Sequence, residues 1–216
     1  MTSIAPWFLL AHGAGAGSDS AWMVRWRGYL ETLGEVVVFD YPYVQAGRRR
    51  PDPLPRLLEA HARALEEART SRRGAPVLVG KSLGGRVGCH LALERSVGAI
   101  VCLGYPLVSP SARRAQAQGR PPPPLRDRVL LELTTPILFV QGTRDPLCPL
   151  EELERTRARM RAPHELHVVP TGDHSLIATK THLAAQGITQ ETLDRAALGS
   201  IRSFLARHLD AGAADR

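Results

Sequence analysis

Val79-Gly80-Lys81-Ser82-Leu83-Gly84-Gly85 is the stretch that decides the fold of this 216-residue chain. It contains Gly-x-Ser-x-Gly between the apolar run 76–79 and a segment, 83–95, that reads as a helix. A strand-to-helix turn of this kind holds its serine in a strained conformation, and small residues two positions away let neighbouring chain pass close by. The pattern predicts that Ser82 is a nucleophile raised at the end of a strand. The alternative is a glycine-rich turn whose serine only caps the helix.

Two other loops supply the partners that a serine nucleophile needs. Asp145 follows the apolar run 136–140, and His174 follows the run 166–169. His174 can take the proton of Ser82 and later return it to a leaving group, while Asp145 orients the imidazole. The chain order serine, aspartate, histidine is the order expected when such a turn lies in an α/β sheet. Asp173 is the alternative acid, but a neighbour of His174 in sequence cannot easily reach back to the far ring nitrogen.

The transition state of acyl transfer also needs donors for a developing oxyanion. One expected donor is the backbone N–H of Leu83, the residue after the nucleophile. The other is expected from the small residues after the first strand, at Ala14 or Gly15. The glycines at 13, 15 and 17 lack the Gly-x-Gly-x-x-Gly spacing of a dinucleotide site, so we expect no cofactor. His12 is expected to hold this loop by hydrogen bonding rather than to act in catalysis.

Strand and helix signals alternate along the chain, which predicts an α/β fold with a mostly parallel sheet and helices on both faces. No internal repeat or composition break divides the chain, so we expect one domain over residues 1–209, with a frayed tail over 210–216. The segment Tyr105–Pro124 ends in four prolines and is expected to be irregular from residue 107. No helical cap domain is expected, and whether this segment acts as a lid stays open. Strands are expected at 7–11, 36–39, 76–80, 97–103, 136–140 and 166–169, and helices at 20–33, 54–71, 83–95, 125–133, 150–160 and 190–208.

The net charge of +7 comes almost entirely from arginine. A basic surface can attract nucleic acid, but here the arginines are interleaved with glutamates over 58–73 and 151–161, as on solvated helix faces. We therefore expect no nucleic-acid partner. Arg48, Arg49 and Arg50 are interpreted as a solvated charge run, with the binding of an anionic substrate group as the alternative. Lys81, beside the nucleophile, is given no role.

No apolar run is long enough to span a bilayer, so no membrane association is expected. Three cysteines are too few for a disulfide framework, and none has a metal-binding spacing, so neither a disulfide nor a metal site is expected. A cytoplasmic location follows as the expectation. The oligomeric state is left open.

Several further sequence segments match motifs of one known protein family. The chain resembles the α/β-hydrolase-like family that includes small bacterial hydrolases of the dienelactone-hydrolase type and testis-expressed α/β-hydrolase-like proteins of animals. The resemblance covers residues 7–205 and implies the α/β-hydrolase fold, of about six strands, with the triad Ser82, Asp145 and His174. The motifs that carry it are Ala11–Gly17, Phe39–Tyr43, Gly47–Pro51, Gly80–Arg86, Gly104–Leu107, Gln141–Asp145 and Gly172–Ser175.

One position departs from the dienelactone hydrolases, which carry a cysteine nucleophile where this chain has Ser82. The departure favours an ester over a dienelactone as substrate. The sequence thus predicts a cofactor-free serine hydrolase that cleaves a small carboxylic ester or related acyl compound through an acyl-enzyme. Thioester, lactone and amide substrates stay open. The alternative is a catalytically silent binding or scaffold protein with the same fold.

Overall fold

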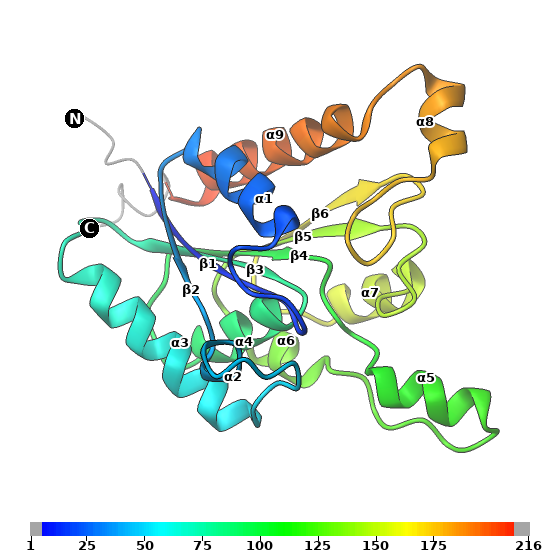
Figure 1. The fold of residues 1–216 in the computed structure, drawn as a ribbon, viewed down its shortest axis with the longest axis horizontal. Coiled ribbons are helices and arrows are strands. Elements are labelled where there is room, and N and C mark those ends of the chain that lie inside the picture. The colour runs from blue at the N-terminus through cyan, green and yellow to red at the C-terminus, as the bar shows by residue number, and fades with distance from the viewer. Residues whose placement is uncertain (1–5, 210–216) are drawn as a thin grey trace.

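The sheet is the centre of the molecule. The structure, a computed structural model, describes residues 6–209, except for the side chains of Arg113 and Gln116. Its six strands lie in the order β2-β1-β3-β4-β5-β6, and every neighbouring pair is parallel (Figure 1). The strands are β1 (Trp7–Ala11), β2 (Glu35–Phe39), β3 (Pro76–Lys81), β4 (Ala99–Leu103), β5 (Ile137–Gly142) and β6 (His164–Val169).

The central strands are apolar except near their carboxyl ends, at Lys81 of β3 and Gln141 of β5, because helices cover both faces of the sheet. All residues of β1, β4 and β5 are buried, as are the first five of β3. A continuous run of this kind is typical of a parallel sheet with two covered faces. The helices are α1 (Ala21–Glu31), α2 (Pro42–Gln45), α3 (Leu54–Arg69), α4 (Leu83–Leu91), α5 (Pro110–Ala117), α6 (Arg128–Glu132), α7 (Leu150–Arg157), α8 (Lys180–Gln186) and α9 (Gln190–Leu209).

Four clusters of buried apolar residues fill the layers on the two sides of the sheet. On one face, α1 and α9 pack residues such as Trp26 and Phe204 against side chains of β1, β3 and β4. On the other face, α3 and α4 pack beside α6 and α7 (Figure 1). The two-sided covering fixes the position of each strand, so the loops at their carboxyl ends lie on a rigid base.

The expected α/β architecture is confirmed, with local differences. The helix expected at 83–95 ends earlier, at Leu91 of α4. Residues 107–124 are not irregular throughout, because α5 occupies Pro110–Ala117. Proline is compatible with the first turn of a helix, where its missing N–H has no intrahelical acceptor. The one-turn helix α2 lies in the loop expected at 40–55, and α8 is a helix that the sequence analysis did not predict. The tail expected at 210–216 lies outside the described residues.

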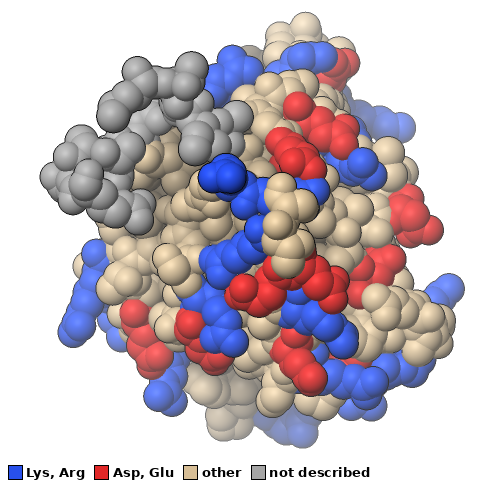
Figure 2. All heavy atoms as spheres, turned by 90° about the vertical axis from the view of Figure 1, so that its left-hand side faces the viewer, with Lys and Arg blue, Asp and Glu red and all other residues tan. Residues whose placement is uncertain are grey.

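Charged side chains of both signs share the surface. On the face that Figure 2 shows, the blue arginine and lysine atoms alternate with red aspartate and glutamate atoms. Elsewhere on the surface, charges also pair within one helix, such as Arg155 with Glu151 and Glu152 in α7. Over residues 6–209 no helix combines the length and the apolar composition needed to cross a bilayer.

Candidate active site

The turn between β3 and α4 is strained at Ser82, which has φ 48° and ψ −109°. Positive φ is rare for a residue with a side chain, and it persists only where the surroundings enforce it. Here the positive φ of Ser82 is enforced because neighbouring backbone segments lie very close to the turn. A Cβ at Gly80 would lie 2.1 Å from the Gly85 nitrogen, and one at Gly84 would lie 2.4 Å from the Ala11 carbonyl oxygen. The glycines are therefore required for the turn that projects Ser82 beyond the sheet.

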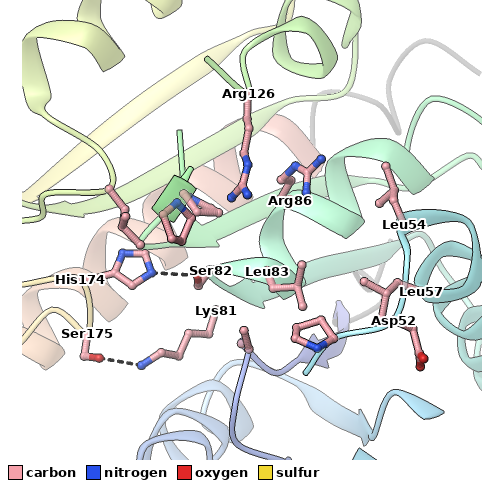
Figure 3. Close-up of a pocket in the computed structure, with 16 residues that line it drawn as sticks. Asp52, Leu54, Leu57, Lys81, Ser82, Leu83, Arg86, Arg126, His174 and Ser175 are labelled. Carbon is pink, nitrogen blue, oxygen red and sulfur yellow. Dashed lines mark hydrogen bonds between the residues drawn. The ribbon is translucent and has the colours of Figure 1, made fainter. Parts of the chain in front are cut away.

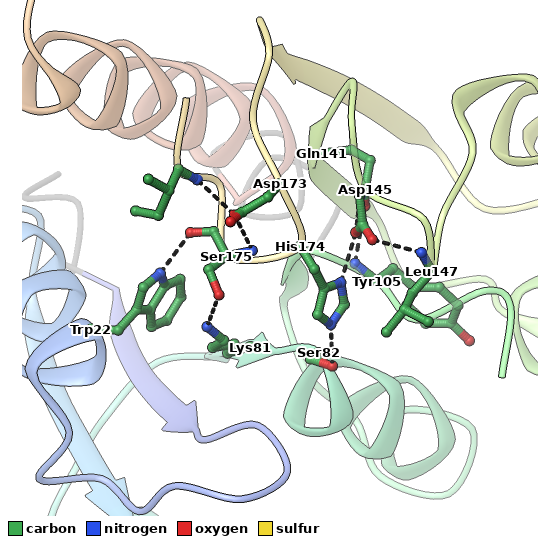
Figure 4. A network of polar contacts seen from close by, with 11 residues as sticks. Trp22, Lys81, Ser82, Tyr105, Gln141, Asp145, Leu147, Asp173, His174 and Ser175 are labelled. Atoms are coloured by element: carbon green, nitrogen blue, oxygen red, sulfur yellow. Dashed lines mark hydrogen bonds and ion pairs between the residues drawn. The ribbon is translucent and has the colours of Figure 1, made fainter. Parts of the chain in front are cut away.

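Three side chains from three loops form one line of hydrogen bonds (Figure 4). The Ser82 Oγ lies 2.8 Å from His174 Nε2, and His174 Nδ1 lies 2.7 Å from Asp145 Oδ2. Because a carboxylate only accepts, Nδ1 carries the ring proton and Nε2 is free to accept from the serine hydroxyl. The structure thus brings together the three residues that the sequence analysis selected.

Asp145 is completely enclosed. Its side chain has no exposed surface, and its other contacts are the Leu147 backbone N–H, 2.8 Å from Oδ1, and Gln141 Nε2, 2.5 Å from Oδ2. Gln141 in turn accepts from the Tyr105 backbone N–H at 3.1 Å. The sequence analysis missed Gln141 as a supporting residue, although its place at the end of β5 was a signal. These donors fix the carboxylate in one orientation towards His174.

Asp173, the alternative acid, has a different position. Its Oδ1 accepts from the backbone N–H groups of Ser175 and Ile177, at 2.7 and 3.0 Å. These two bonds fold the loop after β6 and hold His174 at its tip. The ring nitrogens of His174 are occupied by Ser82 and Asp145 instead.

The loop after β1 is fixed from beneath by His12, which is fully buried. His12 Nδ1 donates to the Gly13 carbonyl at 2.7 Å, and Nε2 accepts from the Tyr41 backbone N–H at 3.1 Å. The Tyr43 hydroxyl also donates to the Gly13 carbonyl, at 3.1 Å. Burial lowers the pKa of His12 from its usual value, which matches a neutral ring in this structural position. Tyr43 was not foreseen as a support of this loop.

A pocket of about 610 Å³ opens above Ser82 (Figure 3). This volume lies in the range of small-molecule sites. Ala14 and Leu83, two of the three expected oxyanion residues, are on its wall, whereas Gly15 is not part of the lining. The lining residues are Gly13, Ala14, Pro51, Asp52, Leu54, Leu57, Lys81, Ser82, Leu83, Arg86, Pro106, Pro110, Arg126, Leu147, His174 and Ser175.

Lys81 crosses from β3 to the loop of His174. Its Nζ donates to Ser175 Oγ at 2.8 Å and lies 4.2 Å from the ring centroid of Trp22. The indole N–H of Trp22 donates to the Ser175 carbonyl at 2.8 Å. Lys81 and Trp22 therefore clamp the residue that follows His174 (Figure 4).

The arginine run 48–50 does not enter the pocket. Arg48 pairs with Asp52 at 2.8 Å, and Arg49 and Arg50 are exposed. Among the residues with described side chains, no group of three or more His, Cys, Asp and Glu has the arrangement of a metal site.

Comparison with known proteins agrees with this architecture. A family model described as an alpha/beta hydrolase domain matches residues 5–206. The structure is similar to a dienelactone hydrolase from Anabaena variabilis, with 17% identity, TM-score 0.65, and coverage of 96% of this chain and 88% of the other. It is also similar to a Paleococcus ferrophilus monoacylglycerol lipase, with 17% identity, TM-score 0.65, and coverage of 92% and 94%. An alpha-beta serine hydrolase homologue from Coxiella burnetii has 19% identity, TM-score 0.62, and coverage of 90% and 86%.

Proposed function

The chain belongs to the alpha/beta hydrolase domain family, and from that premise we propose that it is a serine hydrolase of carboxylic esters or related acyl compounds. The unbroken line from Asp145 through His174 to Ser82 is the observation that carries the proposal. Its hydrogen-bond distances let a proton move between serine and imidazole without rearrangement. The pocket beside Ser82 gives an acyl compound room to bind.

In the acylation step, Ser82 Oγ attacks the carbonyl carbon while its proton moves to His174 Nε2. The imidazolium formed is stabilised by Asp145, which keeps its own charge. The tetrahedral intermediate then collapses, the bond to the leaving group breaks, and Nε2 returns the proton to that group. Ser82 is left as an acyl ester.

The oxyanion of the intermediate needs two donors that point into the pocket. The Leu83 N–H stands at the first residue of α4, where helical amides have no intrahelical acceptor. The Gly13 carbonyl is held by His12 and Tyr43, and a trans peptide directs the Ala14 N–H to the opposite side. Because Ala14 lines the pocket, this geometry favours it over Gly15 as the second donor.

Deacylation repeats the sequence with water. His174 removes a proton from water as the water oxygen attacks the acyl carbon. It then protonates Ser82 Oγ as the ester bond breaks, so the acid leaves and the enzyme is restored.

Covalent labelling with a fluorophosphonate probe tests the proposal directly. We expect one label per chain in the native protein and none in Ser82→Ala. Hydrolysis of p-nitrophenyl acetate should fall by about 10⁴-fold or more in the same variant. Folded native protein that takes up no label and cleaves none of a panel of acyl esters would instead be a binding protein.

A further inference from the structure

We propose that Arg86 and Arg126 form an anion subsite in the pocket of Ser82, and that the substrate is a short acyl compound with a second, anionic group such as a carboxylate. This inference rests on the proposed hydrolase function and names its substrate class. Both arginines line the pocket together with Ser82, and Figure 3 shows both guanidinium groups on the same wall of it.

Unlike the other partly buried arginines, these two have no acidic partner. Neither Arg86 nor Arg126 has a carboxylate oxygen within 4.0 Å among the described residues, and Arg86 Nε is buried without an acceptor there. Unfilled Nε atoms also occur at Arg25, Arg72 and Arg157, so the missing carboxylate is what sets Arg86 and Arg126 apart. Burying a guanidinium without an acidic partner is costly, and a bound anion would remove that cost. The other partly buried arginines with described side chains are Arg25, Arg69, Arg72 and Arg157, which pair with Asp194, Glu66, Glu35 and Glu154 in that order.

The two cations also act on each other. Burial lowers the pKa of Arg126, and the nearby positive charge of Arg86 lowers it further. Two like charges side by side in a half-buried wall raise the free energy of the empty site. An anion between them removes the repulsion and accepts from both planar forks, a geometry that suits a carboxylate.

Both side chains project from backbone that is already fixed. Arg86 lies in the first turn of α4, where its N–H donates to the Ser82 carbonyl. The Arg126 N–H donates to the Leu107 carbonyl at 2.9 Å, and its own carbonyl accepts from the Tyr105 hydroxyl at 2.7 Å. Little backbone ordering is therefore needed when an anion binds.

Carboxylates near the pocket do not cancel this charge. Asp52, on the pocket wall, is neutralised by Arg48, and Asp127, next to Arg126, pairs with Arg159 at 3.4 Å. Lys81 adds a third cation to the lining. A pocket whose net charge is positive concentrates anionic ligands.

The spacing limits the length of the substrate. Arg86 stands four residues after Ser82, about one helical turn, which corresponds to an axial rise of about 6 Å along the backbone. Because both guanidinium groups line the same pocket as Ser82, an acyl group bound at Ser82 would reach them through a short chain. Monoesters of short dicarboxylic acids fit this description, as do short esters with an anionic alcohol part.

The test compares matched esters in native protein, Arg126→Gln, Arg86→Gln and the control Arg128→Gln, whose side chain is 91% exposed. p-Nitrophenyl hemiglutarate is paired with p-nitrophenyl pentanoate, and the acetate ester of 4-hydroxybenzoate is paired with phenyl acetate. We expect kcat/KM to favour the anionic member of at least one pair, and this ratio to fall about tenfold or more in each pocket variant. Arg128→Gln should keep the native ratio. Circular dichroism checks folding, and Arg126→Gln, which alters a loop residue, covers the case in which Arg86→Gln does not fold.

Calorimetric titration of glutarate into Ser82→Ala separates this inference from the proposed function. Binding that weakens with Arg126→Gln, but not with Arg128→Gln, supports the subsite even if no ester is cleaved. Ser82-dependent cleavage of neutral esters, with no preference for either anionic ester and no binding of glutarate, would overturn the subsite and leave the hydrolase intact. Binding of glutarate that is unchanged in both pocket variants would overturn it as well.

Discussion

Asp145 and Asp173 accept hydrogen bonds from different donors, so mutation can separate their roles. Asp145 Oδ2 accepts from His174 Nδ1, whereas Asp173 only caps backbone N–H groups. In Asp145→Asn the amide forces the other histidine tautomer, so Ser82 loses its proton acceptor. We expect kcat for p-nitrophenyl acetate to fall by about 10⁴-fold. Asp173→Asn keeps an oxygen acceptor and should lose less than tenfold. A large loss in Asp173→Asn together with a small loss in Asp145→Asn would instead identify Asp173 as the orienting acid.

Gly84 is held in a space that no side chain can enter. A Cβ there would lie 2.4 Å from the Ala11 carbonyl oxygen and 2.8 Å from that of His12. Both atoms are backbone and cannot move independently of β1. Gly84→Ala should therefore lower the free energy of unfolding by about 1–3 kcal/mol or more in urea titrations.

Gly28 is the matched control for this substitution. It is an exposed residue within α1, and a Cβ there meets nothing within 4 Å. Gly28→Ala should raise the free energy of unfolding by about 0.5–1 kcal/mol, because alanine is the better helix former. A Gly84→Ala protein as stable as the native chain would show that the turn tolerates a side chain.

Lys81 supplies a pH-dependent signal in the same region. Burial lowers the pKa of Lys81 to about 8, while Asp173 acts in the opposite direction. Its ammonium lies over the Trp22 ring, so deprotonation removes a charge from the indole face. We expect the tryptophan emission to titrate with a midpoint near pH 8 in native protein. The step should vanish in Lys81→Met and persist in Lys180→Met, which removes an exposed lysine.

The lowered pKa of Lys81 also predicts how the free energy of unfolding changes with pH. Between pH 8 and the usual lysine pKa of 10.5, the unfolded chain holds a proton at Lys81 that the folded chain has released. The unfolded state binds more protons there, so this residue makes the free energy of unfolding rise with pH across that window. Lys81→Met should show a smaller rise than Lys180→Met. An identical pH dependence in the two variants would contradict the lowered pKa.

At the scale of elements, the sequence predicts strands and helices well where burial requires a regular spacing of apolar residues. The buried strands are continuous apolar runs, and α1 and α3 repeat apolar residues at helical spacing, so both were predicted closely. The proximity of Ser82, His174 and Asp145 could be predicted because the carboxyl ends of parallel strands share one edge of the sheet. α5 and α8 were not predicted, since they bury little: no residue of α8 is buried, and only Ala112 and Ala115 of the described α5 side chains are. The support of Asp145 by Gln141 depends on side-chain direction, which no periodicity encodes.

The shallow burial of α5 predicts its dynamics. Two alanines contribute little apolar contact, and its described N-terminal contacts come mainly from Ser109, whose Oγ accepts from Ala112 N–H at 3.0 Å. Local opening is therefore inexpensive. Hydrogen exchange measured by mass spectrometry should give the α5 amides much weaker protection than those of α4, which is packed against β3. Protection equal to that of α4 would mean that α5 is part of the cooperative core.

At the scale of the whole molecule, the net charge and the arrangement of charges lead to opposite predictions about nucleic-acid binding. The net charge of +7 would favour binding to a polyanion. On the α7 surface, however, glutamates three or four residues away pair with Arg155 and Arg157. Paired charges release few counterions on contact with phosphates. The distribution therefore argues against nucleic-acid binding more strongly than the total argues for it.

A gel shift with random duplex DNA separates the effect of total net charge from the effect of charge pairing. At about 50 mM salt we expect no shift by the native chain, because neutralised arginines gain little from phosphate contact. Changing Glu151, Glu152 and Glu154 to Gln raises the net charge from +7 to +10, one unit for each carboxylate, and releases Arg155 and Arg157 from their partners. That variant should bind weakly, with an affinity that falls as salt rises. A shift by the native chain with the same steep salt dependence would mean that total charge outweighs pairing, and it would place nucleic acid among the partners of this protein.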